Sequence, residues 1–141
     1  MMKPLMIAAL ALLPLPALAA PAEDGIKKAW VRINPAPGRP AAGYFVMING
    51  PEADALVAAE APGARIELHT VAMTDGVMRM RPIDRLALAP GETVEFKSGG
   101  YHLMLFGLTA PGKTLPVTLV FDSGARRTVE AEVRMAGAGP R

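Results

Sequence analysis

Short apolar runs determine the fold class that this chain can adopt. From about residue 28 onward, runs rich in β-branched and apolar residues alternate with clusters of Gly, Pro, Asn and Asp, at intervals of roughly 8 to 12 residues. No stretch sustains the apolar period of a helix. The pattern predicts an all-β protein with strands at residues 28–33, 43–49, 55–60, 65–70, 77–82, 93–97, 102–106, 115–121 and 127–135.

The last of these strands shows how the runs pack. Val129, Ala131 and Val133 alternate with polar or charged residues, which is typical of a strand with one face on a core. This many strands in a small domain need a second layer to cover their apolar faces, so we expect a β-sandwich or a closed barrel. The stretch 53–61 is ambiguous, because its alanines and glutamate also suit a helix.

The N-terminus has the layout of a secretory signal peptide. Lys3 precedes an apolar run from Pro4 to Pro16, and Ala17-Leu18-Ala19 is a small-x-small cleavage site. We therefore expect residues 1–19 to be removed on export and residues 20–141 to form one domain, with its core at about 28–135 and a flexible tail at 136–141. The apolar run is shorter than the ~20 residues of a membrane-spanning helix, so no span is expected in the exported protein.

Charge and cysteine content exclude several classes of function. Without Lys3, 14 basic residues face 13 acidic ones, and only seven aromatic side chains are present, which does not suggest a nucleic-acid partner. The chain has no cysteine, so disulfides and thiolate chemistry are both excluded.

Histidine and methionine are concentrated in one region. Of the six methionines that follow residue 19, four lie between residues 73 and 104, and both histidines, His69 and His102, fall in or beside the same region. This clustering is the most informative feature of the composition.

Strand geometry brings several of these side chains together. His102 and Met104 are two residues apart on one predicted strand, so they share a face with α-carbons roughly 6.5 to 7 Å apart. The Asp75-Gly76 turn predicts a hairpin, which would place His69 and Met80 on neighbouring strands.

The types of ligand favour a particular metal. Thioether sulfur is soft and neutral and imidazole is borderline, so two of each without a carboxylate suit Cu(I) better than Mg, Ca or Mn. Zinc more commonly recruits thiolate or carboxylate. Neutral imidazole is the form that binds, so metal affinity should weaken in acid.

Structural roles compete with this reading at each position. A single histidine in a strand is more often a hydrogen-bonded structural residue than a ligand, and methionine is an ordinary core residue. We assign Met47 and Met135 to the core and leave Met73 and Met78 open between core and a soft surround of the metal. The basic residues are expected to form a solvated face, with docking of an acidic partner as the lesser alternative: Arg79, Arg81, Arg85 and Lys97.

The spacing of the four candidates resembles a known family. His69, ten residues, Met80, twenty-one residues, His102, one residue and Met104 is similar to the signature of the periplasmic copper chaperones called PCu(A)C. The similarity includes the flanking segments and extends from about residue 30 to about residue 133: Gly43-Tyr44, Glu67-Leu68-His69, Gly76-Val77-Met78-Arg79-Met80-Arg81-Pro82 and Gly99-Gly100-Tyr101-His102-Leu103-Met104.

This resemblance implies a cupredoxin-like β-sandwich or barrel and a periplasmic, monomeric protein that holds one Cu(I) ion near its surface. It also implies delivery of copper to the binuclear copper site of cytochrome c oxidase, often alongside a thioredoxin-fold copper protein. Some members carry a His- and Met-rich C-terminal extension that can bind Cu(II). The tail here, residues 136–141, contains neither residue type, so a second, cupric site is not expected.

Other functions remain as alternatives. A blue-copper electron carrier requires a cysteine ligand, which is absent. A copper enzyme is disfavoured because two thioethers stabilise Cu(I), and a hydrolase because Ser98 and Ser123 lie in Gly-flanked turns with no suggested partner, so we expect no catalysis. A copper sequestration or tolerance protein that uses the same site is the main competitor, and a metal-free β-sandwich interaction module is the other.

Overall fold

The computed structural model describes residues 25–108 and 111–136. The predicted signal peptide, its cleavage site and residues 137–141 of the predicted tail lie outside the described residues. Among the residues described, there is no helix that is long and apolar enough to span a membrane.

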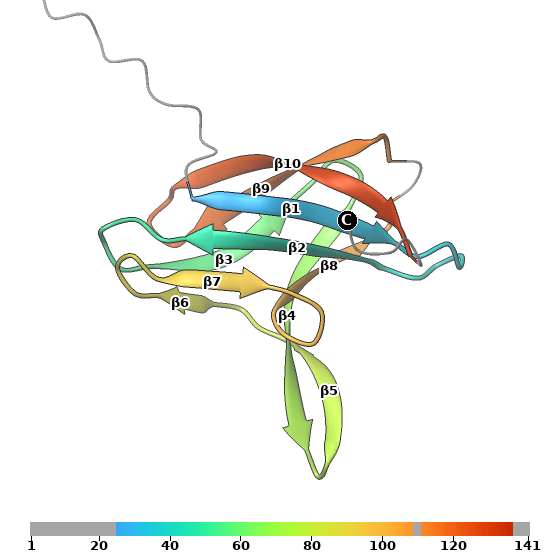
Figure 1. Ribbon diagram of the computed structural model, residues 1–141, viewed down its shortest axis with the longest axis horizontal. Coiled ribbons are helices and arrows are strands. Elements are labelled where there is room, and N and C mark those ends of the chain that lie inside the picture. The colour runs from blue at the N-terminus through green and yellow to red at the C-terminus, as the bar shows by residue number, and fades with distance from the viewer. Residues whose placement is uncertain (1–24, 109–110, 137–141) are drawn as a thin grey trace, which may run out of the picture.

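Ten strands and no helix make up the described part of the chain (Figure 1). Nine strands correspond to the predicted ones, and residues 54–60, the stretch that also suited a helix, are a strand. The strands are β1 (Ile26–Ile33), β2 (Ala41–Ile48), β3 (Asp54–Glu60), β4 (Arg65–Thr74), β5 (Val77–Pro82), β6 (Leu86–Leu88), β7 (Thr93–Phe96), β8 (His102–Phe106), β9 (Thr114–Phe121) and β10 (Arg126–Met135).

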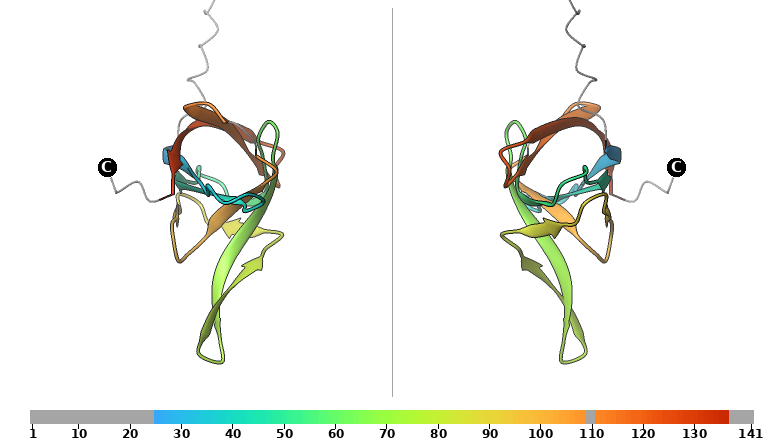
Figure 2. Two further views of the ribbon diagram at one scale, coloured as in Figure 1. Left: turned by 90° about the vertical axis from the view of Figure 1, so that its right-hand side faces the viewer. Right: turned by 90° about the vertical axis from the view of Figure 1, so that its left-hand side faces the viewer.

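All ten strands belong to one sheet that curls on itself. Its order is β5-β4-β8-β2-β1-β10-β9-β3-β6, and β7 pairs with the second half of β2. Along this path every pair is antiparallel except β1 and β10. The two side views in Figure 2 show the strands wrapping around a common interior. The predicted all-β, cupredoxin-like sandwich or barrel is confirmed, although its layers are parts of one continuous sheet.

Alternation along the strands fills this interior. The largest side chains with less than 2 % exposure are Val31, Met47, Leu56, Leu103, Leu105 and Leu119. The assignment of Met47 to the core is thus confirmed. The assignment of Met135 is wrong: it is 54 % exposed, because it is the last residue of β10, where the strand runs past the packed interior.

Two features of the strands were not predicted. The three-residue strand β6 is too short to show alternation, and it exists because it pairs with residues 54–56 of β3. β4 continues four residues beyond its predicted end at Thr70, because Thr74 is still paired with Val77 of β5.

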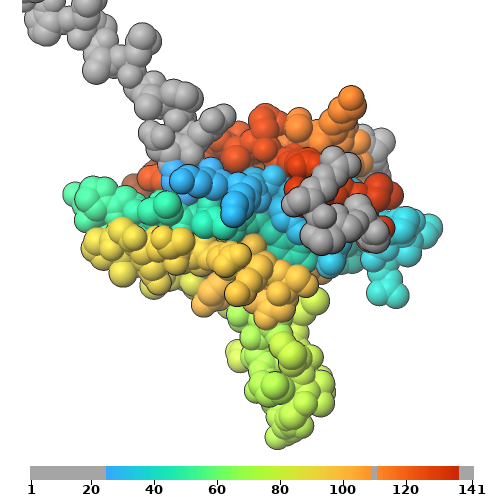
Figure 3. Space-filling model, viewed as in Figure 1, coloured from blue at the N-terminus to red at the C-terminus, as the bar shows by residue number. Residues whose placement is uncertain are grey.

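The β4–β5 hairpin projects from the rest of the molecule (Figures 1 and 3). Asp75 and Gly76 both have positive φ, 51° and 77°, as in the two-residue type I′ turn that suits the twist of a hairpin. β5 is an end strand of the sheet, and all six of its residues are exposed. The hairpin predicted from Asp75-Gly76 is therefore confirmed.

Candidate metal centre

The two histidines lie opposite each other on neighbouring strands. β4 and β8 are antiparallel, with His69 in register with His102, and the two ring centroids are 5.6 Å apart. Leu68 and Leu103, which precede and follow the histidines in this pairing, are buried in the core. Since successive side chains in a strand point to opposite faces, the core leucines direct both imidazoles to the outer face of the sheet.

One nitrogen of the His102 ring is held and the other is unpaired. The Nδ1 atom lies 2.9 Å from the carbonyl oxygen of Gly100. A carbonyl oxygen only accepts, so Nδ1 carries the proton and donates it, and the lone pair is on Nε2. The residue is only 3 % exposed, and its buried Nε2 has no hydrogen-bond partner in the part of the chain that the structure describes. A buried acceptor without a partner is rare and is what a metal ligand looks like without its ion.

His69 shows the same arrangement with the nitrogens exchanged. Its Nε2 lies 2.9 Å from the Glu67 carboxylate, which accepts a hydrogen bond from Nε2–H, and its Nδ1 is buried without a partner among the described residues. Arg65 donates to the other oxygen of Glu67 at 2.5 Å. The hydrogen bond from His69, and then that from Arg65, lowers the pKa of Glu67 below its ordinary value. Glu67 therefore stays charged at neutral pH and fixes both the tautomer and the orientation of the His69 ring.

The methionines flank the histidines on the same face. Met104 is opposite Glu67 on the β8 side, and Met80 is opposite Val71, two pairs beyond His69 toward the hairpin tip. Directly paired residues of antiparallel strands share a face, so the pairing places both thioethers on the face of the two imidazoles. Met80 is 63 % exposed and Met104 is half-buried.

A hollow in the surface connects three of the four expected residues. Met80, His102 and Met104 line it together with Val71, and its volume is about 370 Å³. His69 does not line the hollow itself, but its ring lies next to the ring of His102, which does. The structure thus brings the four predicted residues to one face, with one of them beside the hollow.

The donor set decides which metals this face suits. Among the described residues, no group of three or more His, Cys, Asp or Glu side chains is placed to hold a metal ion. A metal bound here would need the thioethers besides the two imidazole nitrogens. Two soft and two borderline neutral donors fit Cu(I) and give no support to a hard cation.

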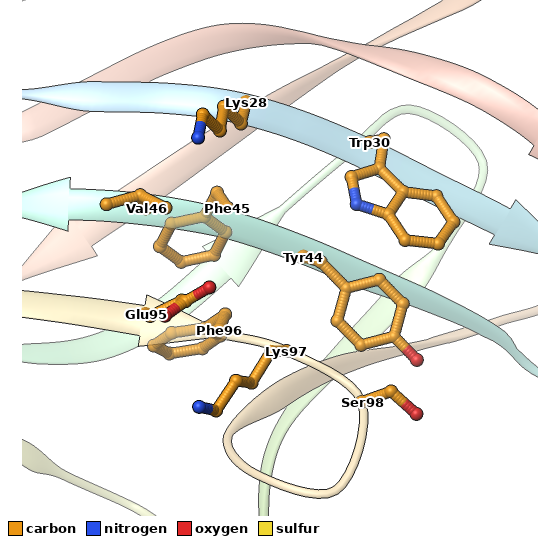
Figure 4. Close-up of a pocket in the computed structure, with 9 residues that line it drawn as sticks. All are labelled: Lys28, Trp30, Tyr44, Phe45, Val46, Glu95, Phe96, Lys97 and Ser98. Atoms are coloured by element: carbon orange, nitrogen blue, oxygen red, sulfur yellow. The ribbon is translucent and has the colours of Figure 1, made fainter. Parts of the chain in front are cut away.

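Two aromatic side chains, Tyr44 and Trp30, lie at or beside the hollow. Tyr44, which lines it, packs its ring 4.8 Å from that of Trp30, and both side chains also line the neighbouring depression shown in Figure 4. This second depression has a volume of about 150 Å³ and contains neither histidines nor methionines. Tyr44 and Ser98 line both cavities, so the depression adjoins the hollow but adds no candidate metal ligand.

Two supporting groups were missed in the sequence. Glu67 was predicted to share a strand face with His69 but was given no role in supporting the ring, and the carbonyl of Gly100 carried no signal at all. The position of Glu67 two residues before His69 was the one available clue, since residues at i and i+2 of a strand share a face.

The comparisons with known proteins agree with this geometry. Residues 25–133 match the family described as "Putative lipoprotein LpqE-like". The chain belongs to the LpqE-like family of PCuAC-type proteins. The "Putative lipoprotein Lxx21020" of Leifsonia xyli subsp. xyli (strain CTCB07) is 28% identical to this chain over 117 residues, which are 79% of this chain and 70% of that protein.

Solved structures of PCuAC proteins resemble this LpqE-like chain. The solution structure of CuI-DR1885 from Deinococcus radiodurans is 30% identical, with a TM-score of 0.59 over 82% of this chain and 80% of that one. The copper-bound PCuAC domain from PmoF2 is 23% identical, with a TM-score of 0.64 over 78% of this chain and 91% of that one, and it supports the fold alone.

Proposed function

We propose that this protein binds one Cu(I) ion per chain through His69, Met80, His102 and Met104. The observation that carries the proposal is the pair of buried imidazole nitrogens without partners, which lie on opposing strands beside two thioethers. The similarity to the Cu(I) form of DR1885, which is 30% identical, supports copper as the metal.

Anaerobic Cu(I) loading followed by X-ray absorption tests the ligand set. We expect one copper per chain with two nitrogen and two sulfur neighbours. Met104→Leu should remove one sulfur neighbour, whereas Met135→Leu, which changes an exposed methionine on β10, should remove none. Substoichiometric loading, or a first shell of nitrogen and oxygen, would overturn the assignment.

The proposed role is transfer of copper, without catalysis. Met80 is mostly exposed, so a partner can replace its sulfur first and then take the ion stepwise from the two histidines, which are less exposed. Each step forms one dative bond to copper and breaks another, and the oxidation state does not change. The recipient that we propose is the binuclear copper site of cytochrome c oxidase, with a thioredoxin-fold copper protein as a further candidate.

Arginines at the hollow and on the hairpin favour transfer over sequestration. Arg32 and Arg39 line the hollow, whereas Arg79 and Arg81 flank Met80 along β5 and lie on the opposite face of that strand. All four are exposed, and none makes an ion pair with another residue that the structure describes. The four basic residues that were predicted to form a solvated face, Arg79, Arg81, Arg85 and Lys97, are all exposed, and Arg85 also pairs with Asp122 at 3.0 Å. Unpaired cations around a metal site fit an acidic protein partner, which a storage protein does not need.

Transfer to the purified apo form of the oxidase domain with the binuclear copper site separates the two roles. We expect copper to move on mixing, at a rate that falls with salt. Replacing Arg79 and Arg81 by Gln should slow transfer and weaken its salt dependence without changing Cu(I) affinity, whereas Arg126→Gln, at an arginine already paired with Glu60, should not. Retention of the copper, with normal oxidase activity in a deletion strain under copper limitation, would favour sequestration.

We also propose that the protein acts in the periplasm as a monomeric single domain. The signal-like N-terminus and the lipoprotein names of the family and of the relative from Leifsonia xyli support export. Fractionation of cells that express the full chain, followed by determination of the N-terminal residue and the mass in solution, tests all three statements.

A further inference from the structure

The projecting hairpin exposes an unusual set of side chains. Four of the six large apolar residues that are exposed in the described chain lie on it, and three of these are methionines: Ile48, Met73, Val77, Met78, Met80 and Met135 are the six. Met73 is 68 % exposed and Met78 is 59 % exposed, so neither stabilises the core. The sequence left the role of Met73 and Met78 open between the core and a soft surround of the metal, and their exposure excludes the core.

The strand register places Met73 and Met78 directly opposite each other, one pair from the hairpin turn. Their β-carbons are therefore about 4.5–5.5 Å apart on a shared face, close enough for two flexible thioethers to hold one ion. Met80 follows Met78 by two residues and lies on the same face, about 7 Å farther along the strand.

This face runs without interruption from the tip to the histidines. Its successive cross-strand pairs are Met73 with Met78, Val71 with Met80, and His69 with Pro82. Alternation puts Arg79 and Arg81 on the opposite face of the hairpin, so no charged side chain lies between the tip and the proposed Cu(I) site. Exposed two-stranded hairpins ordinarily carry polar or charged side chains on both faces, so packing does not account for three thioethers in this row.

We propose that Met73 and Met78 form a second, weaker site for a soft monovalent ion, Cu(I) or Ag(I), which loads the main site through Met80 as a shared ligand. The shared ligand makes this inference rest on the proposed function. The ion moves by exchange of dative bonds: a bond to the Met80 sulfur replaces one of the bonds to Met73 and Met78, and a bond to another ligand of the main site then replaces the second. No electron or proton is transferred at the thioethers.

Titration of protein labelled with ¹³C at the methionine methyl groups tests the second site. Ag(I) serves as an air-stable probe, and Cu(I) is then used under anaerobic conditions. We expect the first equivalent to shift the methyl signals of Met80 and Met104, and further ion to shift those of Met73 and Met78. Met135 should not move. If Met135, which has similar exposure, shifts over the same concentration range as Met73 and Met78, the ion binds to any exposed thioether and the inference is wrong.

Loading kinetics test the connection between the two sites. The double variant Met73→Leu, Met78→Leu keeps side-chain volume at exposed positions, so we expect it to fold, to keep the affinity of the main site and to load several-fold more slowly from a chelated Cu(I) donor. Met135→Leu is the matched control. An unchanged loading rate in the double variant would overturn the relay.

The two proposals can fail separately. In His102→Ala protein, shifts at Met73 and Met78 should persist, because the hairpin does not depend on that imidazole. If the wild-type protein shows no shift at Met80 and Met104 but still shows one at Met73 and Met78, the proposed function fails and the hairpin site remains. If only the signals of Met80 and Met104 shift, the hairpin site does not exist and the proposed Cu(I) site stands.

Discussion

Glu67 should control the affinity of the proposed Cu(I) site without binding the metal. Its carboxylate accepts a hydrogen bond from the Nε2–H of His69 at 2.9 Å, which leaves the lone pair on the buried Nδ1. Removing such an outer partner of a metal-binding histidine typically lowers metal affinity by about 10- to 100-fold. The side chain of Glu67 is 36 % exposed, and water can partly replace its charge. We therefore expect Cu(I) affinity to fall about tenfold in Glu67→Gln, which keeps a hydrogen-bond acceptor, and about 100-fold in Glu67→Ala, which does not.

Competition with a chromophoric Cu(I) chelator at neutral pH measures these affinities. The ¹⁵N chemical shifts of the His69 ring give an independent readout, because the proton should be on Nε2 in the wild type and should redistribute between the nitrogens in Glu67→Ala. Glu130→Ala changes an exposed carboxylate on β10 and should alter neither quantity. Wild-type affinity in Glu67→Ala protein would refute the conclusion that the carboxylate orients His69 for metal binding.

Three further predictions follow from the described structure. Gly43→Ala would place a β-carbon 3.2 Å from the β-carbon of Leu103, so we expect denaturant titration to show a loss of about 1 kcal/mol in unfolding free energy. Cu(I) binding should also weaken, because Leu103 lies between the two proposed ligands on β8. Ser123→Ala removes the side-chain hydrogen bond that is the largest cause of the lowered pKa of Asp54, so an NMR titration should show this pKa rising toward its ordinary value of 3.8. In the wild type, the stability from this hydrogen bond is present above pH 3.8 and is lost as the pH falls through the lowered pKa. The pH-dependent stability should be smaller in the variant. Gly76→Ala puts a residue with a β-carbon at a φ of 77°, which costs about 1 kcal/mol. Amide hydrogen exchange should therefore be faster in the hairpin of the variant, while the rest of the sheet stays protected. Equal exchange rates in the variant and the wild type would contradict the local strain.

Local patterns were sufficient for much of the fold and for part of the site. Nine strands could be predicted because alternation and turn residues act over a few neighbouring positions. The hairpin followed from Asp75-Gly76, whose backbone conformation needs no distant contact. His102 and Met104 were placed on one face because the period of a strand is two.

Other features depend on distant contacts that no local pattern encodes. β6 forms only by pairing with β3, and Met135 is exposed because the packed interior ends before β10 does. The support of each imidazole was also missed. An acceptor such as the Gly100 carbonyl is a backbone atom present in every residue, and only its position in the folded chain makes it a partner of His102.

The sequence by itself determined the residue types and their faces: two histidines and several methionines without a cysteine, in strands whose apolar sides must pack inward. The tertiary structure alone decided that β4 pairs with β8 in the register that sets His69 opposite His102. It also decided which ring nitrogens are left free. The physical reason is that cross-strand register between segments more than 30 residues apart is set by how Leu68 and Leu103 share the core, and that packing exists only when the whole sheet has closed around it.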